Sequence, residues 1–166
     1  MLTVSFTYTV TNVEPTVTQV LTAAPAQVNE GEESILTLSA EDPNAQDPLI
    51  FWLEGQEIGY ATGSGSVEHA VLFEDEGTYT FSARIEDDEA IVDAGTVTVV
   101  VNNLAPVITN LTSDLTVDAG RMFTYAVQAS DPGVYDTITT AWDLDDNGAY
   151  DDDEGTEGTA WFSTTG

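Results

Sequence analysis

The sequence predicts an all-β protein made of tandem antiparallel β-sandwiches. Short segments alternate between apolar and polar residues, as expected of strands that bury one face. Clusters of Gly, Pro, Asn and Asp separate these segments, and no window shows a convincing helical period. The same landmarks recur after about 90 residues, which indicates an internal repeat. Together these observations predict a series of small sandwiches.

The repeat depends on several landmarks that keep the same order and nearly the same offset. An Asn-x-x-Pro entry is followed by a glycine, an Asp-Pro pair and a tryptophan, in two copies. The paired positions are Pro15 and Pro106, Gly31 and Gly120, Asp42 and Asp131, and Trp52 and Trp142. A unit of about 90 residues with about seven short strands is typical of an immunoglobulin-like β-sandwich. We therefore predict tandem sandwiches of this type.

The repeat divides the chain into three predicted parts. Residues 14–103 form a complete sandwich, and residues 104–166 form a second sandwich that is incomplete at its C-terminus. Residues 1–13 supply the last strand of a preceding repeat, because Leu2–Val10 alternates between apolar and polar side chains. We therefore expect a piece of a longer tandem array. A further hypothesis is that Leu2–Val10 pairs with the incomplete sheet of a second copy.

The strands of the complete repeat follow from the same alternation. We predict them at residues 36–40, 50–53, 67–73, 79–85 and 96–101, with turn clusters between them. The segment 50–53 is apolar throughout, which is typical of a central strand. Trp52 and its counterpart Trp142 occupy the position where sandwiches place a core aromatic residue. We expect both indoles in the core; the alternative is a surface that stacks against sugar rings.

The charge of the chain excludes some classes of partner. It has 30 acidic and 2 basic residues, and its formal net charge is −28. Nucleic acid is excluded because phosphate contacts require Lys or Arg, and anionic membrane surfaces are disfavoured for the same reason. Repulsion among this many negative charges destabilises the fold unless it is screened. Bound divalent cations or a permanently salty medium would screen it. No apolar run is long enough to span a membrane, so no membrane insertion is expected.

The sequence offers no recognisable catalytic constellation. There is no cysteine, so disulfides, zinc–thiolate sites and a cysteine nucleophile are excluded. The only histidine, His69, lies on a predicted strand without serine and aspartate partners in a recognisable order. The segment Gly63-Ser64-Gly65-Ser66 does not fit the Gly-x-Ser-x-Gly turn of hydrolases. We therefore expect no enzyme activity.

The densest chemistry lies in the loop from Asp143 to Glu154. Oxygen ligands recur there with the spacing of a calcium loop, and Gly148 stands where the backbone must turn sharply. The ligands are the side chains of Asp143, Asp145, Asn147, Asp151 and Glu154, with the carbonyl of Ala149. Residues 137–141 predict a strand and not a helix, so we expect a rigid structural calcium site. A solvated acidic turn is the alternative.

A second acidic group is expected where one repeat enters the next. In an immunoglobulin topology, the loop after the second strand and the loop before the last strand share one end of the sandwich. The residues at this end are Asp42, Asp47, Glu86, Asp87, Asp88 and Glu89, beside Asn12 and Glu14. Calcium that bridges two repeats is one interpretation, and scattered surface charge is the other. At the second junction the counterparts are Asn102, Asn103 and Asp131.

These landmarks resemble the polycystic-kidney-disease (PKD) repeat, an immunoglobulin-like sandwich of cell-surface proteins. The matching motifs are Asn12-Val13-Glu14-Pro15, Gly31, Asp42-Pro43, Gly77-Thr78-Tyr79-Thr80 and Trp142–Gly148. The first full unit departs from the pattern at Trp52-Leu53-Glu54-Gly55, which lacks the acidic turn. The resemblance implies the same fold and an extracellular or cell-surface location.

The sequence therefore predicts a non-enzymatic extracellular module, a calcium-stabilised spacer or adhesion unit in a tandem-repeat surface or secreted protein. The expected partners are neighbouring repeats of the same chain, with a protein or polysaccharide ligand, or self-association, as further options. The alternative is an accessory polysaccharide- or protein-binding module of a secreted hydrolase. An exposed row of aromatic side chains would favour that alternative.

Overall fold

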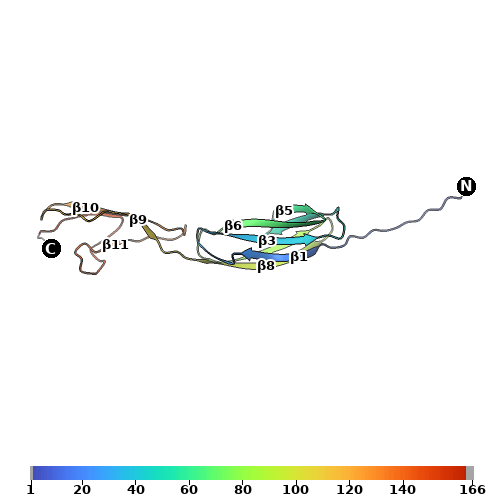
Figure 1. The fold of residues 1–166 in the computed structure, drawn as a ribbon, viewed down its shortest axis with the longest axis horizontal. Coiled ribbons are helices and arrows are strands. Elements are labelled where there is room, and N and C mark those ends of the chain that lie inside the picture. The colour runs from blue at the N-terminus through green and yellow to red at the C-terminus, as the bar shows by residue number, and fades with distance from the viewer. Residues whose placement is uncertain (1, 164–166) are drawn as a thin grey trace. The chain divides into compact units, whose positions relative to one another are not determined.

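The computed structural model describes residues 2–163, and these residues contain β-strands and no helix (Figure 1). The predicted all-β fold class is therefore confirmed. The chain divides into two compact units, Met1–Asn102 and Asn103–Gly166. This division falls next to the boundary at residue 103 that the repeat predicts.

Unit 1 contains eight strands. They are β1 (Thr16–Ala24), β2 (Gln27–Asn29), β3 (Glu33–Glu41), β4 (Pro48–Leu53), β5 (Gln56–Thr62), β6 (Ser64–Leu72), β7 (Gly77–Glu86) and β8 (Ile91–Asn102). Their neighbour order is β1-β3-β6-β5-β4-β7-β8-β2. The strands predicted for residues 36–101 fall inside these elements except for Phe73, which lies just after β6, and the structure adds β1, β2 and β5.

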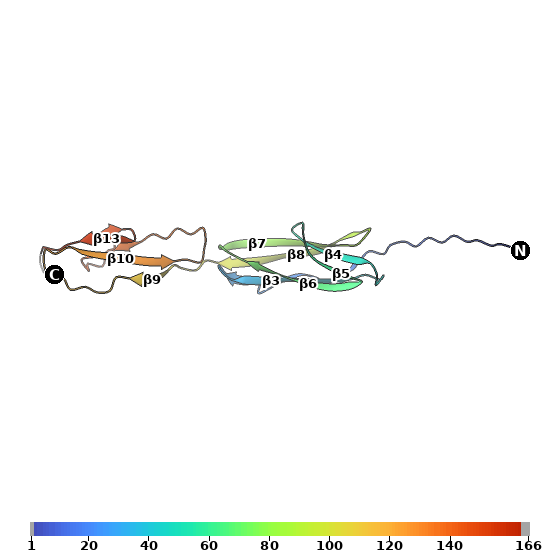
Figure 2. The same cartoon turned by 90° about the horizontal axis from the view of Figure 1, so that it is seen from above.

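The strands of unit 1 form two layers. β5 and β6 share a single pair, Thr62 with Ser64, so the sheet folds over at this point. One layer is then β1-β3-β6 and the other is β5-β4-β7-β8-β2 (Figure 2). The pairs in unit 1 are antiparallel except β2 with β8, where Gln27–Asn29 runs parallel to Val100–Asn102. This arrangement is an immunoglobulin-like β-sandwich.

The core of unit 1 lies between the two layers and follows strand alternation. Successive side chains of a strand point to opposite faces, so every second residue can be buried. On β3 the buried hydrophobic residues are Leu36, Leu38 and Ala40. On β4 they are Leu49, Phe51 and Leu53, and the remaining core comes from β1, β2, β7, β8 and Phe73.

The expectation that Trp52 belongs to the core was wrong. Its neighbour Phe51 is fully buried, whereas Trp52 is half-buried on the other face of β4. The guanidinium of Arg84 covers its ring at 5.0 Å from the centroid. All four residues of segment 50–53 are apolar, on both faces of the strand. Composition alone therefore does not decide which of them face the core. The outer face of this strand is packed as well, but by a cation and not by a second sheet.

The N-terminal segment has no strand in the structure. Residues 2–15 are assigned to no element, and the side chains of Leu2 and Phe6 are 92% and 85% exposed. The predicted strand at Leu2–Val10 was therefore wrong for this chain by itself. A strand requires a hydrogen-bonded neighbour, and none of the described strands pairs with this segment.

Unit 2 has shorter elements and a smaller core. Its strands are β9 (Val107–Leu111), β10 (Phe123–Ser130), β11 (Ala141–Trp142), β12 (Asp153–Glu154) and β13 (Glu157–Ala160). They form a three-stranded sheet in the order β13-β10-β9 and a separate hairpin of β11 and β12. The strand expected at residues 137–141 is reduced to β11. Tyr125 and Val127 of β10 are the buried hydrophobic residues among those described in this unit.

The predicted repeat is visible in equivalent hydrogen bonds of the two units. Gly31 and Gly120 both have positive φ, 79° and 78°. The N–H of Gly31 donates to the carbonyl of Phe73, and the N–H of Gly120 donates to the carbonyl of Phe162, each at 2.7 Å. Only glycine adopts this left-handed conformation without strain, so the matching glycines reflect matching turns.

Truncation of Phe51 tests the position of the core. Phe51→Ala should destabilise unit 1 by about 3–5 kcal/mol, because it leaves a cavity between the layers. Ile50→Ala should cost clearly less, since Ile50 is half-exposed on the same strand. Chemical denaturation of both variants measures the difference. Equal losses would contradict the observed register of β4.

Candidate metal centre

The calcium-type loop of unit 2 closes a β-hairpin. Ala141 pairs with Glu154 and Trp142 pairs with Asp153, so residues 143–152 connect the two strands. The equivalent hairpin of unit 1 pairs Leu53 with Gln56 and needs only a tight turn. The sequence analysis therefore placed the loop correctly at a strand-to-strand connection. Unit 2 carries a much longer loop at the position where unit 1 has a tight turn.

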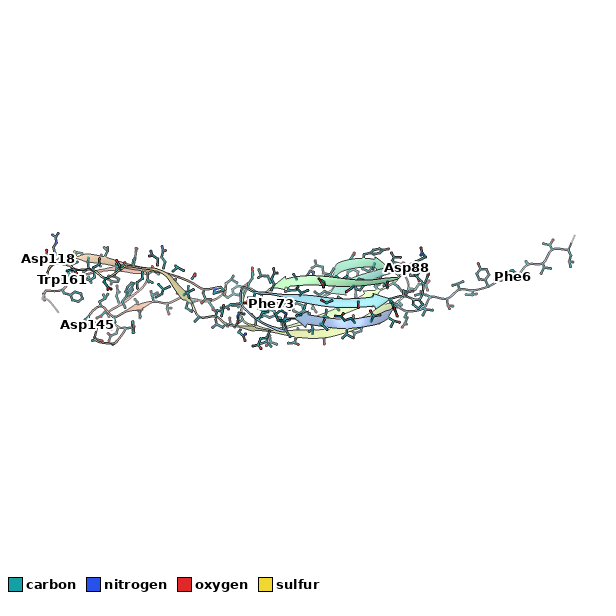
Figure 3. The ribbon with its side chains drawn as sticks, viewed as in Figure 1. Phe6, Phe73, Asp88, Asp118, Asp145 and Trp161 are labelled. Atoms are coloured by element: carbon teal, nitrogen blue, oxygen red, sulfur yellow. The ribbon has the colours of Figure 1, made fainter. Side chains whose placement is uncertain are left out.

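Three carboxylates meet in this loop. Asp143, Asp145 and Asp152 each offer one oxygen, and the three oxygens lie within 4.8 Å of one another. Asp145 is labelled in Figure 3. Calcium binds oxygen at 2.3–2.6 Å, so two ligands of one ion lie up to about 5 Å apart. The observed spacing therefore suits a single bound cation.

Main-chain N–H groups orient these carboxylates. The N–H groups of Leu144 and Asp145 donate to Oδ2 of Asp152 at 2.6 and 3.2 Å. The N–H groups of Asn147 and Gly148 donate to the two oxygens of Asp143 at 3.2 and 2.9 Å. Bonds of this kind hold an ionised carboxylate in place and leave lone pairs available for a cation.

The structure brings together only some of the predicted ligands. Asp143 and Asp145 are in the group, whereas Asp151 is exposed and outside it. Glu154 belongs to β12 and pairs with Ala141. The side chain of Asn147 accepts the N–H of Ala149 at 2.7 Å, which shapes the turn.

Asp152 is the residue that the sequence reasoning missed. It stands where the hairpin register returns the chain opposite Asp143, since Trp142 pairs with Asp153. The run Asp151-Asp152-Asp153 shows that carboxylates gather at this point of the sequence. The ligand spacing of a helix-flanked calcium loop, however, selects Asp151 and not Asp152. In a hairpin, cross-strand register and not loop position decides which carboxylates meet.

Two aromatic side chains, Tyr125 and Trp142, pack against each other beneath the hairpin that carries the loop. The rings of Tyr125 and Trp142 meet edge to face, with centroids 4.7 Å apart. The indole N–H of Trp142 donates to the carbonyl of Gly155 at 2.8 Å, and the hydroxyl of Tyr125 donates to the carboxylate of Asp153. These contacts fix both strands of the hairpin that carries the three carboxylates.

The bond to Asp153 raises the pKa of Tyr125 to about 12, with smaller contributions from burial and from nearby negative charge. A hydrogen bond donated by the phenol stabilises its neutral form, which is why the pKa rises.

Unit 2 also contains a large groove of about 800 Å³. Its lining includes the aromatic residues Phe123, Tyr125, Trp142, Tyr150 and Phe162. The exposed fraction of Tyr150 is 73%, so at least one aromatic ring is open to solvent. Trp142 is half-buried against Tyr125, intermediate between the two predicted placements.

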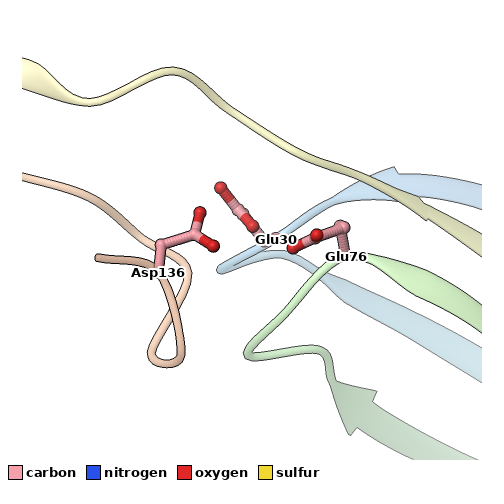
Figure 4. Close-up of side chains that lie close together, drawn as sticks. All are labelled: Glu30, Glu76 and Asp136. Atoms are coloured by element: carbon pink, nitrogen blue, oxygen red, sulfur yellow. The ribbon is translucent and has the colours of Figure 1, made fainter. Parts of the chain in front are cut away.

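The acidic loops of unit 1 gather at the end that the sequence analysis predicted. Asn12 donates its side-chain N–H to Asp87 at 2.9 Å, which places the entry segment beside the loop before β8. Glu30 and Glu76 lie at the other end of the sandwich, with carboxylate oxygens within 4.8 Å of each other (Figure 4). The sequence analysis did not single out this second pair. His69 is half-buried on β6, opposite Leu36.

Comparisons with known proteins find only distant structural similarities. No family model matches the chain, and no curated protein matches it. Among solved structures, the CARDB domain of a Pyrococcus furiosus protein, crystallised with di-metal ions, has 13% identity and a TM-score of 0.38. That similarity covers 57% of this chain and 97% of the other. The same domain solved by NMR has 14% identity and a TM-score of 0.37, covering 52% and 94%.

A second similarity is to the fibronectin(III)-like modules of Clostridium thermocellum CbhA. It has 13% identity and a TM-score of 0.35, and it covers 71% of this chain and 63% of that one. These distant similarities carry no functional argument. Within the described residues there is no helix of the length and apolarity that crossing a membrane requires. Unit 1 is an immunoglobulin-like β-sandwich, and unit 2 is a smaller all-β unit.

The hydrogen bond of Tyr125 predicts a delayed tyrosine titration. The pKa of Tyr125 is about 12 in the folded state against 10.0 for a free tyrosine. The stabilisation from this bond is complete below pH 10 and is lost as pH rises from 10 to 12. Tyrosinate absorbance against pH should show one late transition that Asp153→Asn shifts to lower pH. Tyr125→Phe should remove it, and an unchanged titration in both variants would contradict the assignment.

Proposed function

We propose that the chain is a non-enzymatic spacer or adhesion module of a secreted or surface protein, stabilised by calcium in the Asp143–Glu154 loop. The observation that supports this most directly is the meeting of Asp143, Asp145 and Asp152 on one hairpin. Calcium favours carboxylate and carbonyl oxygen ligands, and the loop offers these without any competing cationic side chain. The expected affinity, on the order of 10⁻⁴–10⁻³ M, suits calcium outside the cell.

The proposed role is mechanical. Sandwich cores stabilise each unit, and calcium fixes the acidic loop. The landmarks shared by the two units support membership of the PKD-like sandwiches, with neighbouring repeats of the same chain as the main partners. Self-association through Leu2–Val10 is part of this proposal, because its apolar side chains are exposed. Most acidic residues lie outside the strands and His69 lies on a strand, an arrangement that supports a non-catalytic role.

Thermal unfolding with calcium, magnesium or chelator at matched ionic strength tests the metal. Calcium at ten times its dissociation constant should stabilise unit 2 by about 1.4 kcal/mol. This corresponds to a shift in Tm of several degrees for a unit of this size. Asp145→Asn should remove the part of the shift that is specific to calcium.

Asp146→Asn is the matched control. Asp146 lies next to Asp145 but outside the group of three carboxylates, and asparagine tolerates its positive φ of 58°. This variant should keep the calcium response. If ionic strength alone raises Tm, the acidity serves a salty medium and the calcium proposal is wrong.

A second candidate function is binding of a polysaccharide or protein as an accessory module of a secreted hydrolase. The aromatic groove of unit 2 favours it, because sugar rings stack on exposed aromatic faces beside carboxylate acceptors. Tyr150 and Asp143 both line this groove.

Affinity electrophoresis in gels that contain soluble polysaccharides tests this candidate. Retardation by one polysaccharide that Tyr150→Ala abolishes would support it. Tyr60→Ala is the control, since Tyr60 is an exposed aromatic residue of unit 1. Mobility unchanged by any polysaccharide would count against a sugar ligand and leave the spacer role.

A further inference from the structure

Unit 2 contains one layer of the sandwich that unit 1 forms with two. β10 pairs with β9 and β13 in the same way that β3 pairs with β1 and β6, and the hairpin of β11 and β12 corresponds to β4 and β5. In unit 1 the second layer also contains β7, β8 and β2, which contribute to the core. The residues described in unit 2 form no strands in the positions of these three. Much of the inner face of the β9-β10-β13 sheet is therefore uncovered.

The large groove of unit 2 is this uncovered inner face. Tyr125, Val127 and Ala129 of β10 line it, and they align in the repeat with the buried hydrophobic residues of β3. Ile108 of β9 pairs with Ala129 and also lines the groove. Its counterpart Val17 packs against the core of unit 1, whereas Ile108 is 64% exposed. A position that is packed in unit 1 is thus open to solvent in unit 2.

The segment Leu2–Val10 has the pattern of the strand that covers this face in unit 1. Alignment of Pro15 with Pro106 places the segment on β8. The aligned pairs are Phe6 with Val97, Tyr8 with Val99 and Val10 with Val101. The three valines belong to the core of unit 1 or pack against it. The side chains at the same positions of Leu2–Val10 are apolar but exposed, and Figure 3 shows Phe6 with no strand beside it.

Charge favours this segment over the other surfaces of a second copy. Two copies repel each other, because each carries a formal net charge of −28. Residues 2–13 contain no charged side chain, and Asp114 and Asp143 are the charged residues among those that line the groove. The segment can therefore be buried in the groove without bringing an acidic group with it.

We infer that the groove of unit 2 binds the segment Leu2–Val10 of a second copy, in the position that β8 has in unit 1. This rests on the self-association proposed above and names its docking site. The apolar side chains of the segment cover the inner face of β9 and β10, as in the addition of a strand to a sandwich. In unit 1, Gln27–Asn29 runs parallel to Val100–Asn102. The repeat therefore places residues 9–11 of the second copy beside residues 116–118.

Each copy offers one segment and one groove, so the association is head to tail and does not stop at a dimer. Size-exclusion chromatography with light scattering should show a mass that rises with the concentration of the full chain. Salt should strengthen the association, because it screens the repulsion between copies.

Two variants block opposite sides of the contact. Tyr8→Asp places a charge on the face of the segment that enters the groove, and Ile108→Asp places one in the groove. Each variant alone should associate at least about tenfold more weakly than the unchanged chain. Both side chains are exposed in the single copy, so Tm should not change. If Ile108→Asp does unfold unit 2, Val117→Asp replaces it, because Val117 lines the groove outside the strands.

Mixing the two variants is the decisive measurement. The Tyr8→Asp chain keeps its groove and the Ile108→Asp chain keeps its segment, so an equimolar mixture should form a one-to-one dimer that grows no further. If the mixture forms no dimer, the inference is overturned. If Ile108→Asp and Val117→Asp both associate like the unchanged chain, the docking site is wrong while self-association through the segment stands. The calcium proposal is tested separately by Tm, so either proposal can fail without the other.

Thr7→Asp and Val107→Asp are the matched controls. Thr7 lies next to Tyr8 on the opposite face of the alternation. Val107 lies next to Ile108 and is similarly exposed, at 59%, but does not line the groove. Both controls should associate like the unchanged chain. Equal weakening by the controls and by the blocking variants would show a general effect of charge and would overturn the inference.

Cysteine cross-links test the position of the segment, since the chain has no native cysteine. In the mixture, Thr9→Cys is added to the Ile108→Asp chain and Thr116→Cys to the Tyr8→Asp chain. Paired residues of neighbouring strands lie about 5 Å apart, within the range that a disulfide spans, so oxidation should link the two chains. Thr7→Cys in place of Thr9→Cys should link them much less. Equal yields would overturn the assignment to the position of β8.

Discussion

The shortage of cationic side chains is the constraint on which the rest of the structure depends. With 30 acidic and 2 basic residues, almost no carboxylate can find an ion pair within the chain. Most of the acids lie outside the strands, where main-chain N–H groups are free to donate. Asp87, Asp143 and Asp152 each accept such donors. The strands contribute the apolar cores, and the loops hold most of the carboxylates and supply main-chain donors to them.

Much of the fold could be predicted from the sequence because alternation and turn residues are local signals. Most of β3, β4, β6, β7 and β8 follows from them, and the matching hydrogen bonds at Gly31 and Gly120 agree with the predicted repeat. The orientation of Trp52 could not be predicted, because residues on both faces of β4 are apolar. The strand at Leu2–Val10 could not form, because pairing depends on a neighbour that the segment does not have in this chain.

The candidate metal centre shows the same division between local and non-local information. The position of the loop follows from the repeat, which aligns Trp142 with Trp52 at the end of a strand. The ligand set does not follow from spacing, because Asp152 joins the group through the register of β11 and β12. Likewise, the acids of unit 1 could be assigned to one end of the sandwich from topology. The burial of Asp42 and Asp87 depends on packing, which no motif encodes.

The parallel pairing of β2 with β8 determines how unit 1 would respond to tension. The chain enters beside Asp42 and leaves after Asn102 at the other end of the sandwich. A pull on the two ends drives β2 and β8 in opposite directions along their length. Their hydrogen bonds, including those from Val100 to Ala26 and from Glu30 to Asn102, are then sheared together and not broken one at a time. The short strand β2 thus makes unit 1 resist tension along its length.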